Sequence, residues 1–274
     1  MHKPRHSVHA TPHFRSVWIS DTHLGYKDAK VEYLQHFLES VKCDRLYLLG
    51  DIVDLWSMKK RFLWPTSHYD VIKLLFAKAK SGTEIIYVPG NHDDPMREYA
   101  GHRIGPVLVQ RDLIHTTAAG KRLLLIHGDE LDAEIRVTRF IRHFGDPIYD
   151  LVLFINRWCN RIRNRLGLPY WSLANYLKVN IKDARRVIEK YEHAATNLAR
   201  QQGLDGVICG HIHKAEVREI DGMLYCNDGD WVESCTALVE DQQGNINVID
   251  WLEQERQNAI AAAAKKAEAK PIAA

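Results

Sequence analysis

Five short motifs rich in acid, imidazole and amide side chains stand out in this sequence, and each follows a short apolar run. The motifs are Asp21-Thr22-His23, Gly50-Asp51, Gly90-Asn91-His92-Asp93, His127-Gly128-Asp129 and Gly210-His211-Ile212-His213. A single Asp or His after a strand is usually a turn former or a helix cap. Five endings of matching chemistry are hard to explain as turns, because a turn has no need of an imidazole. The motifs therefore predict a shared metal site.

The spacing within the motifs suits metal binding. Residues two apart on an extended chain point to the same side, so Asp21 and His23 reach one centre, as do His211 and His213. Mixed carboxylate, imidazole and amide ligands suit Mn²⁺, Fe or Zn²⁺ better than Mg²⁺ alone. Two divalent ions are only partly neutralised by two carboxylates, so they attract a phosphate and activate a bridging water. We expect two divalent ions, with Mn as the first choice, and a phosphate-containing substrate.

The apolar runs before the motifs predict five buried strands, because β-branched and aliphatic residues fill each run and a polar residue or Gly ends it. Helical periodicity between the runs is clearest over 31–38 and 71–79. Helix-length connections indicate a mainly parallel α/β sheet, in which ligands bind at the carboxyl edge. We therefore expect all five motifs on one edge of one sheet. The expected strands cover 17–20, 46–49, 85–88, 123–126 and 207–209.

The pattern changes after His213, where turn residues join short apolar runs. Asp221-Gly222 separates 217–220 from 223–226, and Gly244-Asn245 separates 237–239 from 246–251. Such dipeptides are typical of hairpin turns. This end of the chain is predicted to form antiparallel hairpins.

Three parts of the chain depart from these patterns. We expect a flexible N-terminal tail over 1–14 and a low-complexity C-terminal tail over 255–274, either a frayed helix or disordered. The domain itself is expected to cover 15–254, with an inserted helical cap at about 131–200. The stretch 132–190 holds 12 Lys and Arg against 6 Asp and Glu, so the basic charge is concentrated in the expected cap.

The composition is that of an ordinary soluble protein. Of 274 residues, 46% are hydrophobic and 26% are charged, with a formal net charge of +2. So small a charge does not indicate nucleic acid, and no nucleic-acid partner is expected. The five cysteines form no Cys-x-x-Cys pair, which favours reduced thiols. Neither a secretory signal nor an apolar run of roughly 20 residues is present, so we expect a cytoplasmic protein.

In order and spacing, the five motifs resemble those of the calcineurin-like metallophosphoesterases, and the resemblance covers about residues 16–230. It implies two β-sheets packed as a sandwich and flanked by helices. It also implies a dinuclear centre bridged by Asp51, and in-line attack on a P–O bond by a metal-bridging hydroxide. One ion would be bound by Asp21, His23, Asp51 and His213, and the other by Asp51, Asn91, His127 and His211.

His92 is the motif histidine that this resemblance leaves without an ion. In the family, the corresponding residue stabilises charge at phosphorus or protonates the leaving oxygen, so His92 is the candidate catalytic residue. Asp54 and Asp93 are candidates for orienting neighbouring groups. Simple loop or capping roles would suit these two carboxylates equally well.

Within this class, the chain length, the arginine-rich segment after His127 and the sequence Gly229-Asp230-Trp231 resemble the UDP-2,3-diacylglucosamine hydrolases of lipid A synthesis. Those hydrolases usually carry Arg where this chain has His92. We expect a pyrophosphatase acting on a similar nucleotide-linked lipid. The alternatives are a metallophosphodiesterase of nucleotides or nucleic acid, and a general phosphatase outside lipid A synthesis. A non-catalytic scaffold is not expected, because the ligands and His92 are all present.

The expected cap combines an apolar stripe with a basic run. Such a segment suits an anionic membrane surface, here the inner face, or acyl chains held under a lid. A helix packed on the domain with a solvated charged end would have the same pattern. The stripe consists of Ile148, Leu151, Val152 and Ile155, and the candidate substrate-binding residues are Arg157, Arg161 and Arg165.

Overall fold

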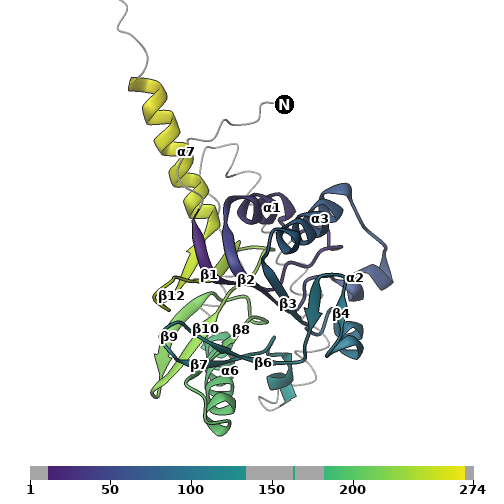
Figure 1. The fold of residues 1–274 in the computed structure, drawn as a ribbon, viewed down its shortest axis with the longest axis vertical. Coiled ribbons are helices and arrows are strands. Elements are labelled where there is room, and N and C mark those ends of the chain that lie inside the picture. Colours follow the sequence, from purple (N-terminus) through teal and green to yellow (C-terminus); the bar gives the residue numbers. More distant parts are fainter. Residues whose placement is uncertain (1–11, 134–162, 164–181, 269–274) are drawn as a thin grey trace, which may run out of the picture.

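Residues 12–133, 163 and 182–268 are described by the computed structural model, which places two β-sheets between layers of helices (Figure 1). The first sheet has the strand order β12-β11-β1-β2-β3-β5-β4, and the second has the order β6-β7-β8-β10-β9. The two-sheet fold implied by the family resemblance is confirmed. The expectation of one sheet carrying all five motifs is wrong, because a buried strand has the same apolar pattern in either sheet.

The first sheet contains three of the five predicted strands. A parallel centre is extended by antiparallel pairs at both edges. The parallel strands are β1 (His13–Ile19), β2 (Lys42–Leu49), β3 (Glu84–Val88) and β5 (Val107–Val109), and the edge strands are β4 (Arg103–Ile104), β11 (Thr236–Glu240) and β12 (Ile246–Asp250).

The second sheet contains the other two predicted strands. Its parallel strands are β7 (Arg122–Leu125), β8 (Gly206–Cys209) and β10 (Met223–Asn227), with β6 (Leu113–Thr116) and β9 (Glu216–Ile220) antiparallel at the edges. Both predicted hairpins are present, as β9–β10 and β11–β12. Asp221 and Gly222 have φ of 49° and 77°, as a two-residue hairpin turn requires. The parallel pairing of β10 with β8 was not predicted.

Side chains alternate along the central strands, and this alternation builds three apolar layers. From β2, Leu46 and Leu48 pack with α1 (Val31–Ser40) and α3 (Thr66–Lys80), while Tyr47 and Leu49 fill the space between the sheets. On the other side, α6 (Lys182–Gln201) packs on the second sheet through a buried face that includes Tyr191. The layers therefore run helix, sheet, sheet, helix.

The predicted cap ends too late in the sequence. From Lys182 onward its residues belong to α6, which covers the second sheet as part of the main body. The predicted helix is confirmed over 182–200, but helical periodicity does not say what a helix packs against. The remainder of the expected cap, 134–162 and 164–181, lies outside the described residues, as do 1–11.

The smaller helical elements are α2 (Leu55–Lys60), η1 (Asp94–Tyr99) and η2 (Asp129–Ala133). The last helix, α7 (Trp251–Glu268), packs through Trp251 and then projects away from the sheets (Figure 1). Residues 256–262 of α7 are exposed, as their polar and alanine-rich sequence suggests. No helix within the described ranges is both long enough and apolar enough to span a bilayer.

Candidate metal centre

The five motifs meet where the carboxyl ends of β1, β2 and β3 face those of β7 and β8. Backbone hydrogen bonds join neighbouring loops, from the Asp21 amide to the Gly50 carbonyl at 3.0 Å and from the Gly210 amide to the His127 carbonyl at 3.1 Å. Between the sheets, the His211 amide donates to Asp21 Oδ2 at 3.0 Å. These contacts bring loops from both sheets to one site.

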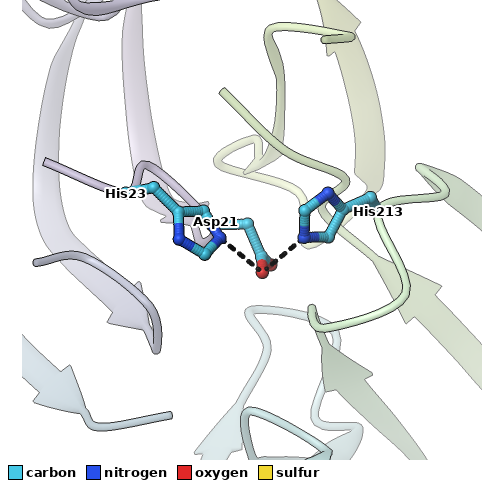
Figure 2. A group of neighbouring side chains, drawn as sticks. All are labelled: Asp21, His23 and His213. Carbon is cyan, nitrogen blue, oxygen red and sulfur yellow. Dashed lines mark ion pairs between the residues drawn. The ribbon is translucent and has the colours of Figure 1, made fainter. Parts of the chain in front are cut away.

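One cluster is centred on Asp21, whose carboxylate lies between the rings of His23 and His213 (Figure 2). Asp21 Oδ1 is 2.9 Å from His213 Nε2 and 3.7 Å from His23 Nε2. Both Asp21 and His23 are buried. The three side chains therefore present their ligand atoms to a common point.

A second cluster contains Asp21, Asp51 and His127. Asp51 Oδ2 is 3.4 Å from His127 Nε2 and 3.9 Å from His23 Nε2. A single oxygen of Asp51 thus lies between a histidine of the first cluster and the histidine of the second. This is the position that a bridging carboxylate needs.

Several buried ligand-type atoms at this site have no hydrogen bond. They include His23 Nε2, Asn91 Oδ1 and His127 Nε2. A buried polar atom without a partner costs about 1–3 kcal/mol, so such atoms are rare in folded proteins. Three such atoms lie beside the buried carboxylates of Asp21 and Asp51. Together they match the donor atoms that divalent first-row ions bind. The residues therefore fit a metal centre.

The second ring nitrogens fix how two of the histidines are oriented. His127 Nδ1 donates to the Leu49 carbonyl at 2.7 Å, and His23 Nδ1 contacts Asp54 Oδ2 at 3.2 Å. With Nδ1 occupied in both, the lone pair is left on Nε2, the atom that faces the carboxylates.

Asp54 lies between two histidines, because its Oδ1 also contacts His92 Nδ1 at 3.0 Å. The same oxygen accepts the Ser57 amide at 2.7 Å and so caps α2. Burial opposes the charged form of this carboxyl, but the adjacent imidazoles of His23 and His92 outweigh it and hold the pKa of Asp54 below its ordinary value. Asp54 is thus a charged acceptor for both rings.

Asp93 ties the loops after β2 and β3 together. Its carboxylate accepts the amides of Gly90 at 2.6 Å, Ile52 at 2.7 Å and Asp51 at 3.2 Å. In the same region, the His92 amide donates to Asp51 Oδ1 at 2.8 Å. These bonds fix the backbone on either side of Asp51.

The backbone at the site is strained. Seven non-glycine residues of the described chain have positive φ, and five belong to the motifs. This left-handed region is disfavoured for residues with a Cβ and persists where the surrounding structure enforces it, often at functional sites. The five are Asp21, His23, Asp51, His211 and His213, with φ between 45° and 67°.

Sequence reasoning missed three residues that hold motif side chains. Asp132 contacts His211 Nε2, and Ser20 links Asp21 Oδ2 to Asp228 Oδ1, the latter at 2.6 Å. Ser20 could have been noticed as a polar residue ending a buried strand beside Asp21. Nothing in the sequence marks Asp132 or Asp228, because their partners come from distant segments. The predicted Arg157, Arg161 and Arg165 lie outside the described residues.

The chain is similar to known proteins over most of its length. The family model of the calcineurin-like phosphoesterases matches residues 14–215. A UDP-2,3-diacylglucosamine hydrolase of Psychromonas ingrahamii is 27% identical over 86% of this chain and 96% of its own. A second UDP-2,3-diacylglucosamine hydrolase, from Xanthomonas axonopodis, is 28% identical over 84% of this chain and 96% of its own. A solved archaeal phosphodiesterase aligns at 14% identity over 85% of this chain and 98% of its own, with a TM-score of 0.42. The chain belongs to the calcineurin-like phosphoesterase family and is a metal-dependent phosphoester hydrolase.

Proposed function

We propose that the site holds two divalent ions. The observation that carries this proposal is the set of buried ligand atoms without hydrogen bonds around Asp51. In this arrangement Asp51 bridges the ions, consistent with its Oδ2 lying within 4 Å of histidines from both clusters. The first ion takes Asp21, His23, Asp51 and His213, and the second takes Asp51, Asn91, His127 and His211.

Bound ions of this kind supply Lewis acidity and lower the pKa of water, which is the chemistry that P–O hydrolysis requires. The chain's own residues would orient the reacting groups. His92 lies at the rim with its side chain 22% exposed, and its Nδ1 is held by Asp54. Its Nε2 is then the atom that gives a proton to the leaving oxygen or stabilises charge at the phosphoryl group.

The proposed reaction is hydrolysis of a pyrophosphate in a nucleotide-linked lipid similar to UDP-2,3-diacylglucosamine. Support comes from relatives of that name aligned over most of both chains at 27–28% identity. The basic, partly apolar segment 134–181 suits an anionic lipid, and peripheral contact with a membrane surface is part of the proposal. Mn²⁺ is the proposed metal, with Fe and Zn²⁺ as the alternatives.

A second candidate is a phosphodiesterase or general phosphatase of wider specificity. His92 favours it, because the diacylglucosamine hydrolases usually carry Arg there. An imidazole can donate a proton, whereas a guanidinium stays protonated and can only stabilise charge.

A substrate screen separates the two candidates. Apo enzyme would be loaded separately with Mn²⁺, Fe²⁺ or Zn²⁺, and metal stoichiometry would be measured before each assay. The substrates would be UDP-2,3-diacylglucosamine, a UDP-sugar without acyl chains, a dinucleotide phosphodiester and an aryl phosphate monoester. We expect two ions per chain and the highest kcat/KM on the acylated UDP compound. A preference for the phosphodiester or monoester would instead select the second candidate.

A further inference from the structure

The ring of His211 is held by a carboxylate that belongs to none of the five motifs. Its Nε2 lies 3.1 and 3.2 Å from the two carboxylate oxygens of Asp132. Asp132 is in η2, which directly follows the His127 motif, whereas His211 follows β8. The contact therefore joins two segments that are distant in sequence but adjacent at the metal site.

The orientation of His211 is opposite to that of His23 and His127, the other two proposed metal-binding histidines with a fixed ring. His23 and His127 use Nδ1 for a protein acceptor and leave Nε2 facing the carboxylates. In His211, Nε2 faces the acceptor, so the lone pair is left on Nδ1. A neutral imidazole has one donor and one acceptor nitrogen, and the partner of one nitrogen decides which atom can bind metal.

The turn that leads into Asp132 is held by contacts of the preceding residues, and the Asp132 side chain is 35% exposed. The preceding Leu131 is buried and packs with α6 residues in the apolar layer on the second sheet. Two further contacts fix the turn: Glu130 Oε2 accepts the Gly128 amide at 3.2 Å, and Asp129 Oδ1 accepts from Arg97 Nη2 at 2.6 Å. The backbone that carries the carboxylate meeting His211 is thus placed by the fold, as an orienting group requires.

We propose that Asp132 is a positioning residue that fixes His211 with its Nδ1 toward the second metal ion. This inference rests on the proposed dinuclear centre. Carboxylates that accept a hydrogen bond from a metal-binding histidine orient the ring and increase its basicity, and losing one usually weakens metal affinity about 10- to 100-fold. Replacing Asp132 should therefore weaken one site and spare the ion held by Asp21, His23 and His213.

The test compares wild type with Asp132→Asn, Asp132→Ala and a control, Asp112→Asn, which removes an exposed carboxylate between β5 and β6. Calorimetric titration of the metal-free proteins with Zn²⁺ gives the affinity of each site, and elemental analysis after dialysis gives the stoichiometry. Histidine side-chain NMR on the zinc-loaded proteins reports which nitrogen of His211 carries the proton. Circular dichroism verifies that each variant is folded.

We expect two ions in wild type and in Asp112→Asn. In Asp132→Ala one site should weaken by about 10- to 100-fold while the other is unchanged. Asp132→Asn should lose less metal affinity, because its amide oxygen can still accept a hydrogen bond from His211 Nε2–H. Unchanged affinities in both Asp132 variants, or a wild-type His211 protonated on Nδ1, would overturn the inference and leave the proposed function standing. A single ion in wild type would refute the dinuclear centre and this inference together.

Discussion

Four histidines of the site have one ring nitrogen beside a fixed protein acceptor. For His127 the acceptor is the Leu49 carbonyl, for His23 and His92 it is Asp54, and for His211 it is Asp132. Each imidazole therefore presents a chosen nitrogen to the site before any ligand arrives, and little rotation has to be restricted when an ion or substrate binds. Asp54 serves two rings at once, so it links a proposed metal ligand to the proposed catalytic residue.

His92→Ala should keep both ions and lose most of the rate. A group that donates a proton or stabilises charge in the transition state contributes about 10²–10⁴-fold. His92 lies outside the two groups that contain Asp21, and it shares a third possible metal-holding group with His23 and Asp54, in which Asp54 Oδ1 lies 3.0 Å from His92 Nδ1. The measurement is kcat on the best substrate, together with metal content. His102→Ala is the matched control, because it removes an exposed histidine ahead of β4. Loss of an ion from the His92 variant would mean that His92 is a ligand.

At this scale the sequence predicted which motif residues lie together at the site, but not all of their partners. Asp21 and His23 could be found because they follow a buried strand and have a spacing that serves metal binding. Asp132 and Asp228 could not, because an Asp among other acidic residues has the same appearance whether it meets solvent or a side chain from a distant segment. Tertiary contacts alone distinguish the two cases.

The loops after the strands approach one another so closely that glycine is required at some positions. A Cβ added to Gly90 would lie 2.4 Å from Asp51 Oδ1 and 2.6 Å from His127 Cδ2. Neither side chain has room to move, since both are buried. Because Gly90 has no Cβ, the loop after β3 can bring Asn91 and His92 close to Asp51.

Gly90→Ala should disturb the metal centre while the fold is retained. A displacement of about 1 Å at reacting groups costs on the order of 10² in rate, so we expect a loss of that size in kcat/KM with lowered metal content. The control is Gly82→Ala, where φ is +104° but nothing lies within 4 Å of the added Cβ. That variant should lose some thermal stability and keep its metal. Full activity in Gly90→Ala would show that the loop can relax.

Strands and hairpins could be predicted element by element, but their packing could not. The apolar run at 123–126 predicted β7, yet nothing in it distinguishes a strand of the first sheet from one of the second. α6 shows the same limit, because the helical periodicity of 182–201 fits a cap helix and a flanking helix equally well. Only the partner surface, a sheet that includes β8 and β10, decides between them.

At the scale of the whole molecule, a buried polar network fastens the two sheets together at the end of β1 away from the metal site. Glu240 of β11 accepts from Arg15 Nη1 at 2.8 Å and the Ala118 amide at 2.8 Å, and it contacts His115 Nε2 at 3.0 Å. Arg15 belongs to the first sheet, whereas His115 lies on β6 of the second. The network therefore joins the two sheets through buried polar side chains.

Glu240→Gln should destabilise the protein at neutral pH but not in acid. Burial opposes ionisation, but His115 and the Ala118 amide outweigh it and lower the pKa of Glu240 in the folded state. A lowered folded pKa gives stability above the unfolded pKa of about 4.3, and this stability is lost as pH falls through the folded pKa. Urea unfolding of the metal-free proteins should show a loss of about 2 kcal/mol at neutral pH, typical of hydrogen bonds to a charged group. A difference that is constant with pH would contradict this account.

The segment between Ala133 and Lys182 is where we expect substrate choice to be set. It leaves the described chain next to Asp132, which contacts His211, and it returns through α6, whose Tyr191 hydroxyl lies 3.4 Å from the His127 and Gly210 carbonyls. Its sequence carries the arginines of the basic run. A large anionic substrate would draw on that charge, whereas a small aryl phosphate ester would need little beyond the ions and His92.

Replacing Arg157, Arg161 and Arg165 together by Gln should therefore lower kcat/KM about 10- to 100-fold on the acylated UDP compound, the range that charged hydrogen bonds supply. Turnover of the aryl ester should change far less. The control replaces Arg185 and Lys190, exposed on α6, by Gln and removes similar charge from the surface of a described helix. With metal content unchanged, equal losses on both substrates would show that the arginines support the fold and do not select the substrate.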